Sequence, residues 1–129
     1  MARDILNRIW TMKGIQTMNE TINWLEPWDS LCTEPTSFER ELYFEMGYGH
    51  ILQGKKVTAI GRRYDCDDFL FQVHDSEFNY AVVHLTYSRM KEKNPSFPRT
   101  KLYKDLNDWI NNRMIPDHSE YMLGEEELD

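Results

Sequence analysis

The chain of 129 residues has only two cysteines, Cys32 and Cys66, and neither forms a Cys-x-x-Cys pair. The spacing gives no support to a zinc or dithiol site, so we expect two reduced thiols that serve in packing. No stretch approaches the ~20 apolar residues of a membrane span, and the N-terminus lacks the apolar core of a secretory signal. We therefore predict a cytoplasmic protein with no cofactor and no membrane partner.

Basic residues are also scarce, with 15 Lys and Arg against 22 Asp and Glu and a net charge of −7. Such a charge repels phosphate backbones and disfavours a general role in binding nucleic acid. The apolar fraction is 40%, with 4 Trp, 7 Tyr and 6 Phe, which predicts a packed interior. The length predicts one domain.

Three apolar runs with alternating side chains follow one another between Lys55 and Tyr87. They predict strands at about 56–64, 69–74 and 79–87, joined by short polar loops into a three-stranded antiparallel meander. Alternation places Phe69, Phe71 and Val73 on one face, which is more apolar than the other.

Helices are predicted on both sides of this meander in the sequence. Thr36 and Glu39 form a capping box for a helix over about 37–46, which Gly47 would end. Thr100 would cap a second helix over about 101–114, and Pro116 would end it. The fold class is therefore α+β, with both helices on the more apolar face of the sheet.

The chain divides into an N-terminal helical extension packed on the core (1–26), a single α+β domain (27–123) and an acidic tail (124–129). The extension carries a short apolar seam, which indicates one helix laid on the core, with contact to a partner as the alternative. Met12 and Met18 are alternative translation starts, so whether residues 1–17 belong to the functional chain stays open. The edges of so small a sheet could be covered by a homodimer.

His84 lies in the most apolar strand, so its ring must find a buried hydrogen-bond partner or line a pocket. The structural role is favoured because no nucleophile or metal-ligand pattern accompanies it. For the functional alternative, Gln72 and Thr86 are the companions, since they share its parity in their strands. Arg62 belongs to a basic patch that could hold an anionic ligand, although a solvated strand end is the simpler interpretation.

Two acidic groups raise the question of a metal. The Asp65, Asp67 and Asp68 cluster lacks the spacing of a calcium loop, so an acidic turn is favoured. His50 follows the helix that presents Glu41 and Glu45, but no fixed metal-binding spacing links them. We therefore predict no metal site and favour a structural His50.

A Gly49-His50 pair leads into Ala59-Ile60-Gly61-Arg62, then Asp67-Asp68, then Tyr80-Ala81-Val82-Val83-His84-Leu85-Thr86. This pattern, over about 38–87, resembles a family of small uncharacterised bacterial proteins. The resemblance implies a bacterial, cytoplasmic origin and carries no established activity. A site shared with that family would use the matching polar positions His50, Asp67, Asp68, His84 and Thr86. Tyr87 stands where the family pattern would have tryptophan, and the N-terminal segment is additional to it.

These observations favour a non-enzymatic binding or protein-interaction module, because each candidate catalytic group has a simpler structural explanation. A protein partner or self-association suits the acidic charge better than nucleic acid does. The alternative is a small hydrolase or other ligand-processing enzyme that uses His84, His50 and the Asp67-Asp68 turn.

Overall fold

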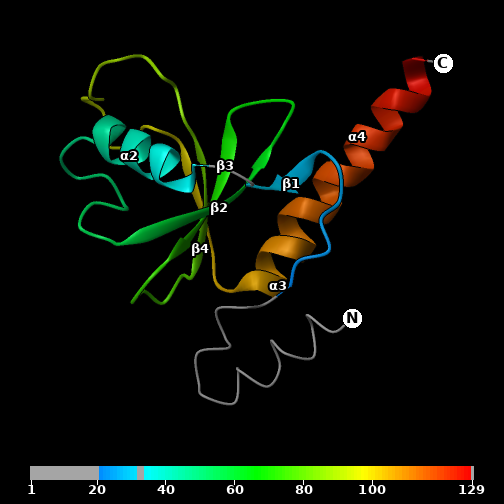
Figure 1. The fold of residues 1–129 in the computed structure, drawn as a ribbon, viewed down its shortest axis with the longest axis horizontal. Helices are drawn as coiled ribbons and strands as arrows, with labels where there is room; N and C mark the ends of the chain where they lie inside the picture. The colour runs from blue at the N-terminus through cyan, green and yellow to red at the C-terminus, as the bar shows by residue number, and fades with distance from the viewer. Residues whose placement is uncertain (1–20, 32–33, 129) are drawn as a thin grey trace.

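The computed structural model describes residues 21–31 and 34–128. It shows an α+β fold in which a five-stranded antiparallel sheet lies between helices (Figure 1). The elements in chain order are β1 Trp28–Ser30, α2 Pro35–Glu45, β2 Val57–Arg63, β3 Asp68–Val73, β4 Tyr80–His84, β5 Thr100–Tyr103, α3 Leu106–Trp109, the π-helix η2 Ile110–Met114 and α4 Ile115–Leu128.

The sheet is a meander in the order β1-β2-β3-β4-β5, and every neighbouring pair is antiparallel. The α+β class and the antiparallel sheet are thus confirmed, and β2, β3 and β4 correspond to the three expected strands. The expected three-stranded meander is incomplete, because β1 and β5 extend it at its two edges. Both added strands are short, with three and four residues, and carry too little alternation to be recognised alone.

Both faces of the sheet are apolar and covered. One face packs against α2 through a cluster that includes Leu42, Phe69 and Phe71. The opposite face packs against the C-terminal helices through Leu70, Val82, Trp109 and others. The expectation that both helices cover one face is therefore wrong, and Figure 1 shows α2 and α4 on opposite sides of the sheet. The second apolar face is built largely by the aromatic residues Trp28, Tyr80, Tyr103 and Trp109.

The predicted helix over 101–114 begins too early. Thr100 starts β5, which pairs with β4 from Thr100↔Val83 to Tyr103↔Tyr80. The helix instead begins at Leu106, where the Asp105 side chain accepts a hydrogen bond from Asp108 N at 2.8 Å. Pairing with a buried neighbouring strand outweighs the helical spacing of the apolar residues in this segment.

Pro116 does not end the helix. The backbone widens into a π-turn over Ile110–Met114, and the Ile115 N–H donates to Ile110 O across five residues. A proline inside a helix has no N–H to donate and clashes with the preceding turn, so a wider turn just before it lets the chain continue. The α4 helix then runs through Leu128, so it includes most of the segment 124–129 that was expected as an acidic tail.

The first described residues differ from the expected helical extension. Residues 21–25 have no regular secondary structure, although Ile22, Trp24 and Leu25 pack against the core on the side of the C-terminal helices. The rest of that extension, residues 1–20, lies outside the described residues. At α2, Glu34 takes the N-cap position, and no side-chain capping bond forms there. Glu39 accepts from Ala59 N at 2.8 Å instead of completing the expected capping box.

Candidate functional site

A hollow of about 580 Å³ opens where the edge of the sheet meets the π-turn. We call it the His84 hollow. It collects residues from β3, β4, β5, η2 and the loop before β5, namely Asp68, Val82, His84, Phe97, Arg99, Thr100, Lys101 and Arg113. Segments that are up to 45 residues apart in the chain therefore supply one surface, since Asp68 and Arg113 meet in it.

His84 and Asp68 form the polar centre of this hollow. They lie opposite each other in the β3–β4 ladder, and Asp68 Oδ1 is 2.7 Å from His84 Nδ1. The Asp68 side chain is 15% exposed, whereas that of His84 is 51% exposed. Of the two alternatives for His84, a buried partner or a place in a pocket, the structure shows the second, because the residue ends β4 and its ring lies in an open hollow. In the described part of the chain, no protein group hydrogen-bonds to its Nε2 atom.

Arg113 joins this pair to a second carboxylate. Its guanidinium donates to Asp68 Oδ2 at 2.9 Å and to Asp117 Oδ2 at 2.9 Å. Burial opposes the charge of Arg113, but hydrogen bonds to Tyr103 and Asp117 raise its pKa, so it stays a cation. Asp117 also accepts from Trp28 Nε1 and pairs with Arg63, which ties the network to β1 and β2.

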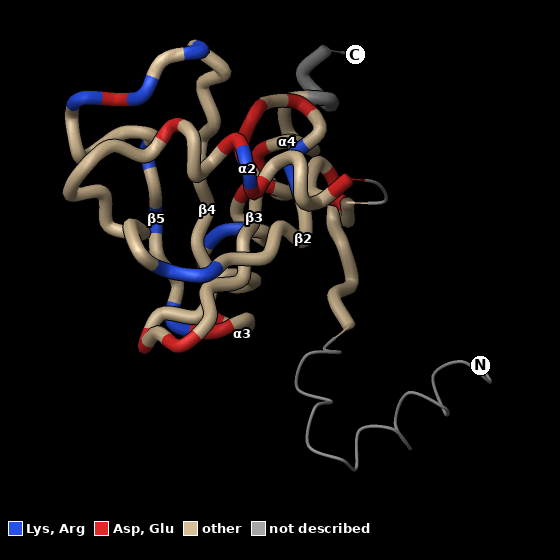
Figure 2. The backbone as a smooth tube through the Cα atoms, turned by 60° about the vertical axis from the view of Figure 1, so that its left-hand side comes forward, with Lys and Arg blue, Asp and Glu red and all other residues tan. Residues whose placement is uncertain are grey.

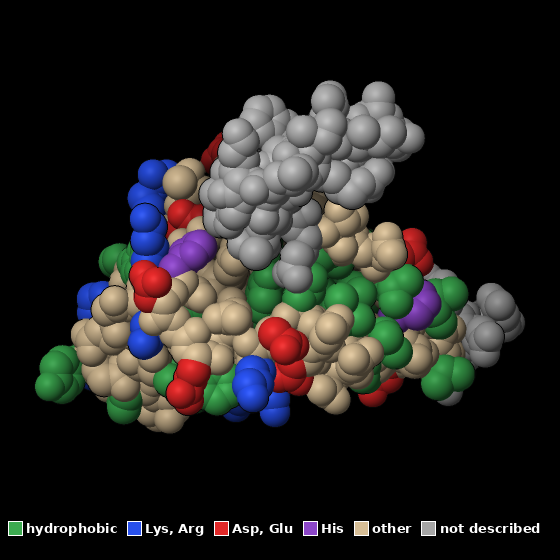
Figure 3. All heavy atoms as spheres, turned by 90° about the horizontal axis from the view of Figure 1, so that it is seen from below, with side chains coloured by type: hydrophobic (Ala, Val, Ile, Leu, Met, Phe, Trp, Pro, Cys, Tyr) green, Lys and Arg blue, Asp and Glu red, His purple; other side chains and the backbone are tan. Residues whose placement is uncertain are grey.

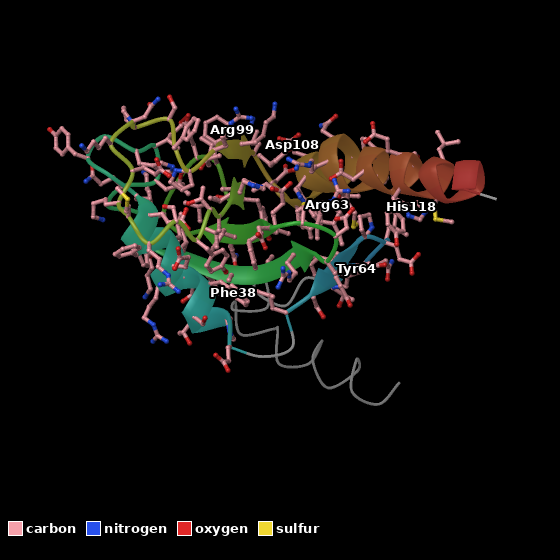
Figure 4. The ribbon with its side chains drawn as sticks, turned by 90° about the horizontal axis from the view of Figure 1, so that it is seen from above. Phe38, Arg63, Tyr64, Arg99, Asp108 and His118 are labelled. Carbon is pink, nitrogen blue, oxygen red and sulfur yellow. The ribbon has the colours of Figure 1, made fainter. Side chains whose placement is uncertain are left out.

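The hollow is basic in an acidic chain. Arg99, Lys101 and Arg113 line it with three positive charges, and among the described residues Asp68 is the one acidic residue that lines it. Figure 2 shows a basic residue on β5, and on the face in Figure 3 Lys and Arg side chains gather at one end, beside a histidine. Arg99 also covers the Phe97 ring at 5.5 Å from its centroid. In Figure 4, Arg99 lies across the sheet from Phe38, which belongs to α2.

His50 is separate from this network of charges. Its side chain is buried, Nδ1 accepts from Leu52 N at 3.0 Å, and Nε2 lies 2.9 Å from Pro98 O. Thr100 Oγ1 also contacts Nε2, at 3.1 Å. Both ring nitrogens are thus engaged with local groups, as a structural histidine requires. The structure does not bring Glu41 or Glu45 into hydrogen-bond contact with it.

The other candidates from the sequence are dispersed. Asp67 pairs with Arg62 at 3.4 Å, and the guanidinium of Arg62 lies over the rings of Phe38 and Phe69. Gln72 lines a different hollow with Asp75 and Asp105. It faces Tyr80, four residues along the ladder from the Asp68–His84 pair, or roughly 13 Å away at the usual rise of a strand.

Thr86 contacts α2 on the opposite side of the sheet. Its backbone N–H donates to both oxygens of Glu45 at 3.0 Å, and its hydroxyl donates to Glu45 Oε1 at 3.1 Å. The expected companions of His84, Gln72 and Thr86, therefore do not meet at one site. Within the described residues, no group of three or more His, Cys, Asp or Glu side chains is placed to hold a metal ion.

Lys101 and Arg113 line the hollow, although the sequence predicted both in one helix and indicated no site role for either. Asp68 was expected in an acidic turn, without its pairing to His84. A signal for this pairing was present, because a hairpin closed by residues 75–78 sets residue 68 opposite residue 84. Arg113 has no comparable signal, since its position depends on how the C-terminal helices pack on the sheet.

Comparison of the chain with protein-family models, with curated proteins and with solved structures found no match. No helix in the described ranges is both long and apolar enough to cross a membrane. The geometry of the His84 hollow is therefore the main indication of function.

Proposed function

We propose that this protein is a binding module for a small anionic ligand, which it holds in the His84 hollow. The observation that carries the proposal is the gathering of Arg99, Lys101 and Arg113 around one cavity in a chain of net charge −7. Asp68 balances one of these charges, and it is already engaged by His84 and Arg113. An anion would therefore meet an excess of positive charge.

The surroundings of the cavity favour a compact anion over a nucleic-acid strand. A strand requires a long basic track with stacking platforms, whereas here the cations surround one hollow of about 580 Å³. Arg113 is held by two carboxylates and is pre-organised, while Lys101 presents its flexible ammonium from an edge strand. Inorganic phosphate and pyrophosphate are suitable probes, because their oxygens accept from both kinds of cation.

Replacement of Lys101 with alanine tests this proposal. We expect Lys101→Ala to weaken the binding of pyrophosphate about fivefold, since one exposed cation contributes on the order of 1 kcal/mol. The matched control is Lys104→Ala, which removes a lysine just beyond β5 that does not line the hollow. Isothermal titration calorimetry at low ionic strength measures both. Equal affinities for the two variants and the wild type, or no binding by the wild type, would contradict the proposal.

A second candidate, hydrolysis at the same hollow, is favoured by the Asp68–His84 pair. A carboxylate at 2.7 Å from Nδ1 orients the ring and leaves Nε2 toward the cavity, as in general acid–base catalysis. His50 and Asp67 do not belong to this form of the hypothesis, because the structure places them elsewhere. The described residues offer no activated nucleophile in the hollow, so water would be the attacking group.

Turnover distinguishes the two candidates. If the hollow is hydrolytic, His84→Gln should retain pyrophosphate binding but lose at least about 100-fold of the hydrolysis rate. Release of inorganic phosphate from pyrophosphate measures the rate, and calorimetry measures the binding. Binding without any turnover by the wild-type protein would leave the binding module as the function and reject the hydrolase.

A further inference from the structure

A second polar cluster, on the α2 side of the sheet, is not used by the proposed function. Glu45 is fully buried, and its carboxylate accepts from Thr86 N, Thr86 Oγ1 and Tyr87 N. The Glu45 backbone carbonyl also accepts from Glu92 N at 3.0 Å. We call this set of contacts the Glu45 clasp. It attaches the segment 86–92 to the C-terminal end of α2.

Glu41 lies one turn before Glu45 on the same helix face, and its Oε2 atom is buried without a hydrogen-bond partner among the described residues. The group beside it is the Glu45 carboxylate, which is itself an acceptor. Two ionised carboxylates in contact repel each other, and a single proton between them removes the repulsion and supplies the missing donor. Hydrogen bonding to Glu45, burial and the charge of Glu45 raise the pKa of Glu41 to about 7.

The segment that Glu45 holds is strained. Tyr87 has a φ of 52° and Arg89 a φ of 69°. Residues other than glycine adopt this left-handed backbone conformation at an energetic cost. The hydrogen bonds to Thr86 and Tyr87 hold this conformation, and Lys91 donates to the Phe44 and Met46 carbonyls at the end of α2. If the Glu45 carboxylate moves, the strain favours release of the segment.

We infer that Glu41 and Glu45 share one proton, and that loss of this proton loosens the Glu45 clasp and the loop that joins β4 to β5. The link to ligand binding rests on the proposed function. His84 ends β4 at the start of this loop, Arg99 ends the loop, and the His84 N–H donates to Arg99 O at 2.9 Å. Both residues line the His84 hollow, so a looser loop should weaken binding of an anion there.

The other charged groups around the pair do not replace this proton. A hollow of about 420 Å³ beside Glu41 is lined by Phe44, Tyr87 and Arg89. Burial and the charges of Glu41 and Asp67 raise the pKa of Tyr87, against an opposing effect of Arg62, so its phenol stays neutral near pH 7. Arg62 lies over the Phe38 and Phe69 rings and bonds to Asp67, and Lys91 contacts backbone carbonyls. None of these groups donates to Glu41 Oε2.

The direction of the pH effect follows from linkage. The ordinary value of 4.5 applies to the unfolded chain and about 7 to the folded one, so folding takes up a proton between them. This proton stabilises the folded protein fully below about pH 4.5, and its contribution is lost as the pH rises through about 7. The clasp should therefore be closed at pH 6 and loosened at pH 8.

Amide hydrogen exchange of the full chain tests the inference. Between pH 6 and pH 8, protection of the Thr86 and Tyr87 amides should fall about tenfold beyond the intrinsic effect of pH. In Glu41→Gln, whose amide donates permanently to Glu45, protection should stay high at both pH values. The matched control Glu77→Gln, in the exposed β3–β4 loop, should behave like the wild type. Protection independent of pH in the wild type, or a fall in Glu41→Gln equal to that of the wild type, would overturn the clasp.

Two further readouts separate this inference from the proposed function. Carboxyl ¹³C titration of the wild-type protein should show the Glu41–Glu45 pair taking up one proton near pH 7, and two ordinary titrations would reject the shared proton. Pyrophosphate affinity should fall about threefold from pH 6 to pH 8 in the wild type relative to Glu41→Gln. Equal changes would reject the link between clasp and hollow. Absence of pyrophosphate binding, with exchange behaving as expected, would reject the proposed function and keep the clasp.

Discussion

Replacement of Glu45 with alanine should lower the free energy of unfolding by about 3–4 kcal/mol. The side chain is fully buried and its carboxylate accepts from three donors, two of them backbone N–H groups. A hydrogen bond to a charged group contributes about 1.5–3 kcal/mol, and a buried donor left without an acceptor carries the whole cost of its desolvation. The strained backbone at Tyr87 would also lose what holds it.

Urea denaturation at pH 6 measures this effect, and Glu39→Ala is the matched control from the same helix. Glu39 accepts from one backbone donor, Ala59 N, and its side chain is only partly buried, so we expect its loss to cost about 1.5 kcal/mol, the low end of that range. Glu45→Gln keeps the shape of the side chain and one acceptor oxygen, so its cost should lie between these two values. A Glu45→Ala variant no less stable than Glu39→Ala would show that the clasp contributes little to the folded state.

The part of the fold that the sequence predicted is the part governed by local patterns. β2, β3 and β4 are long enough for apolar and polar side chains to alternate clearly, and their hairpin loops are short and polar. The spacing of Leu102 and Leu106 predicts a helix, but the two residues lie on either side of the Asp105 cap, and Leu102 belongs to β5. The strand conformation of β5 depends on its pairing with β4, which is a contact between distant parts of the chain.

The candidate site shows the same division between local and distant information. The Asp68–His84 pair follows from the register of one hairpin, so counting residues back from its loop identifies it. Strand parity places Gln72 on the same face as His84, but Gln72 lies too far along the strand to meet it. The role of Glu45 as a buried acceptor could not be predicted, because Thr86 and Tyr87 follow it by 41 and 42 positions in the chain.

Replacement of Arg113 with alanine should have the largest effect on ligand binding and a large effect on stability. Its guanidinium donates to Asp68 and Asp117, whose side chains are each only 15% exposed. Removing it leaves Asp117 with Arg63 and Trp28, and among the described side chains it leaves Asp68 with His84 alone. Because a partly buried carboxylate that loses its partner is costly, we expect the free energy of unfolding to fall by about 2–3 kcal/mol.

The fall in pyrophosphate affinity should exceed the fall expected from the loss of one positive charge. Without Arg113, the Asp68 carboxylate would present uncompensated negative charge to the His84 hollow, so we expect pyrophosphate affinity to fall by more than about tenfold. Arg113→Lys keeps the charge but cannot donate in two fixed directions to Asp68 and Asp117, so it should recover only part of the affinity. Calorimetry below the unfolding temperature of each variant separates binding from stability. If Arg113→Ala loses stability but binds pyrophosphate as tightly as Lys104→Ala does, the role of Arg113 is only structural and the anion is held elsewhere.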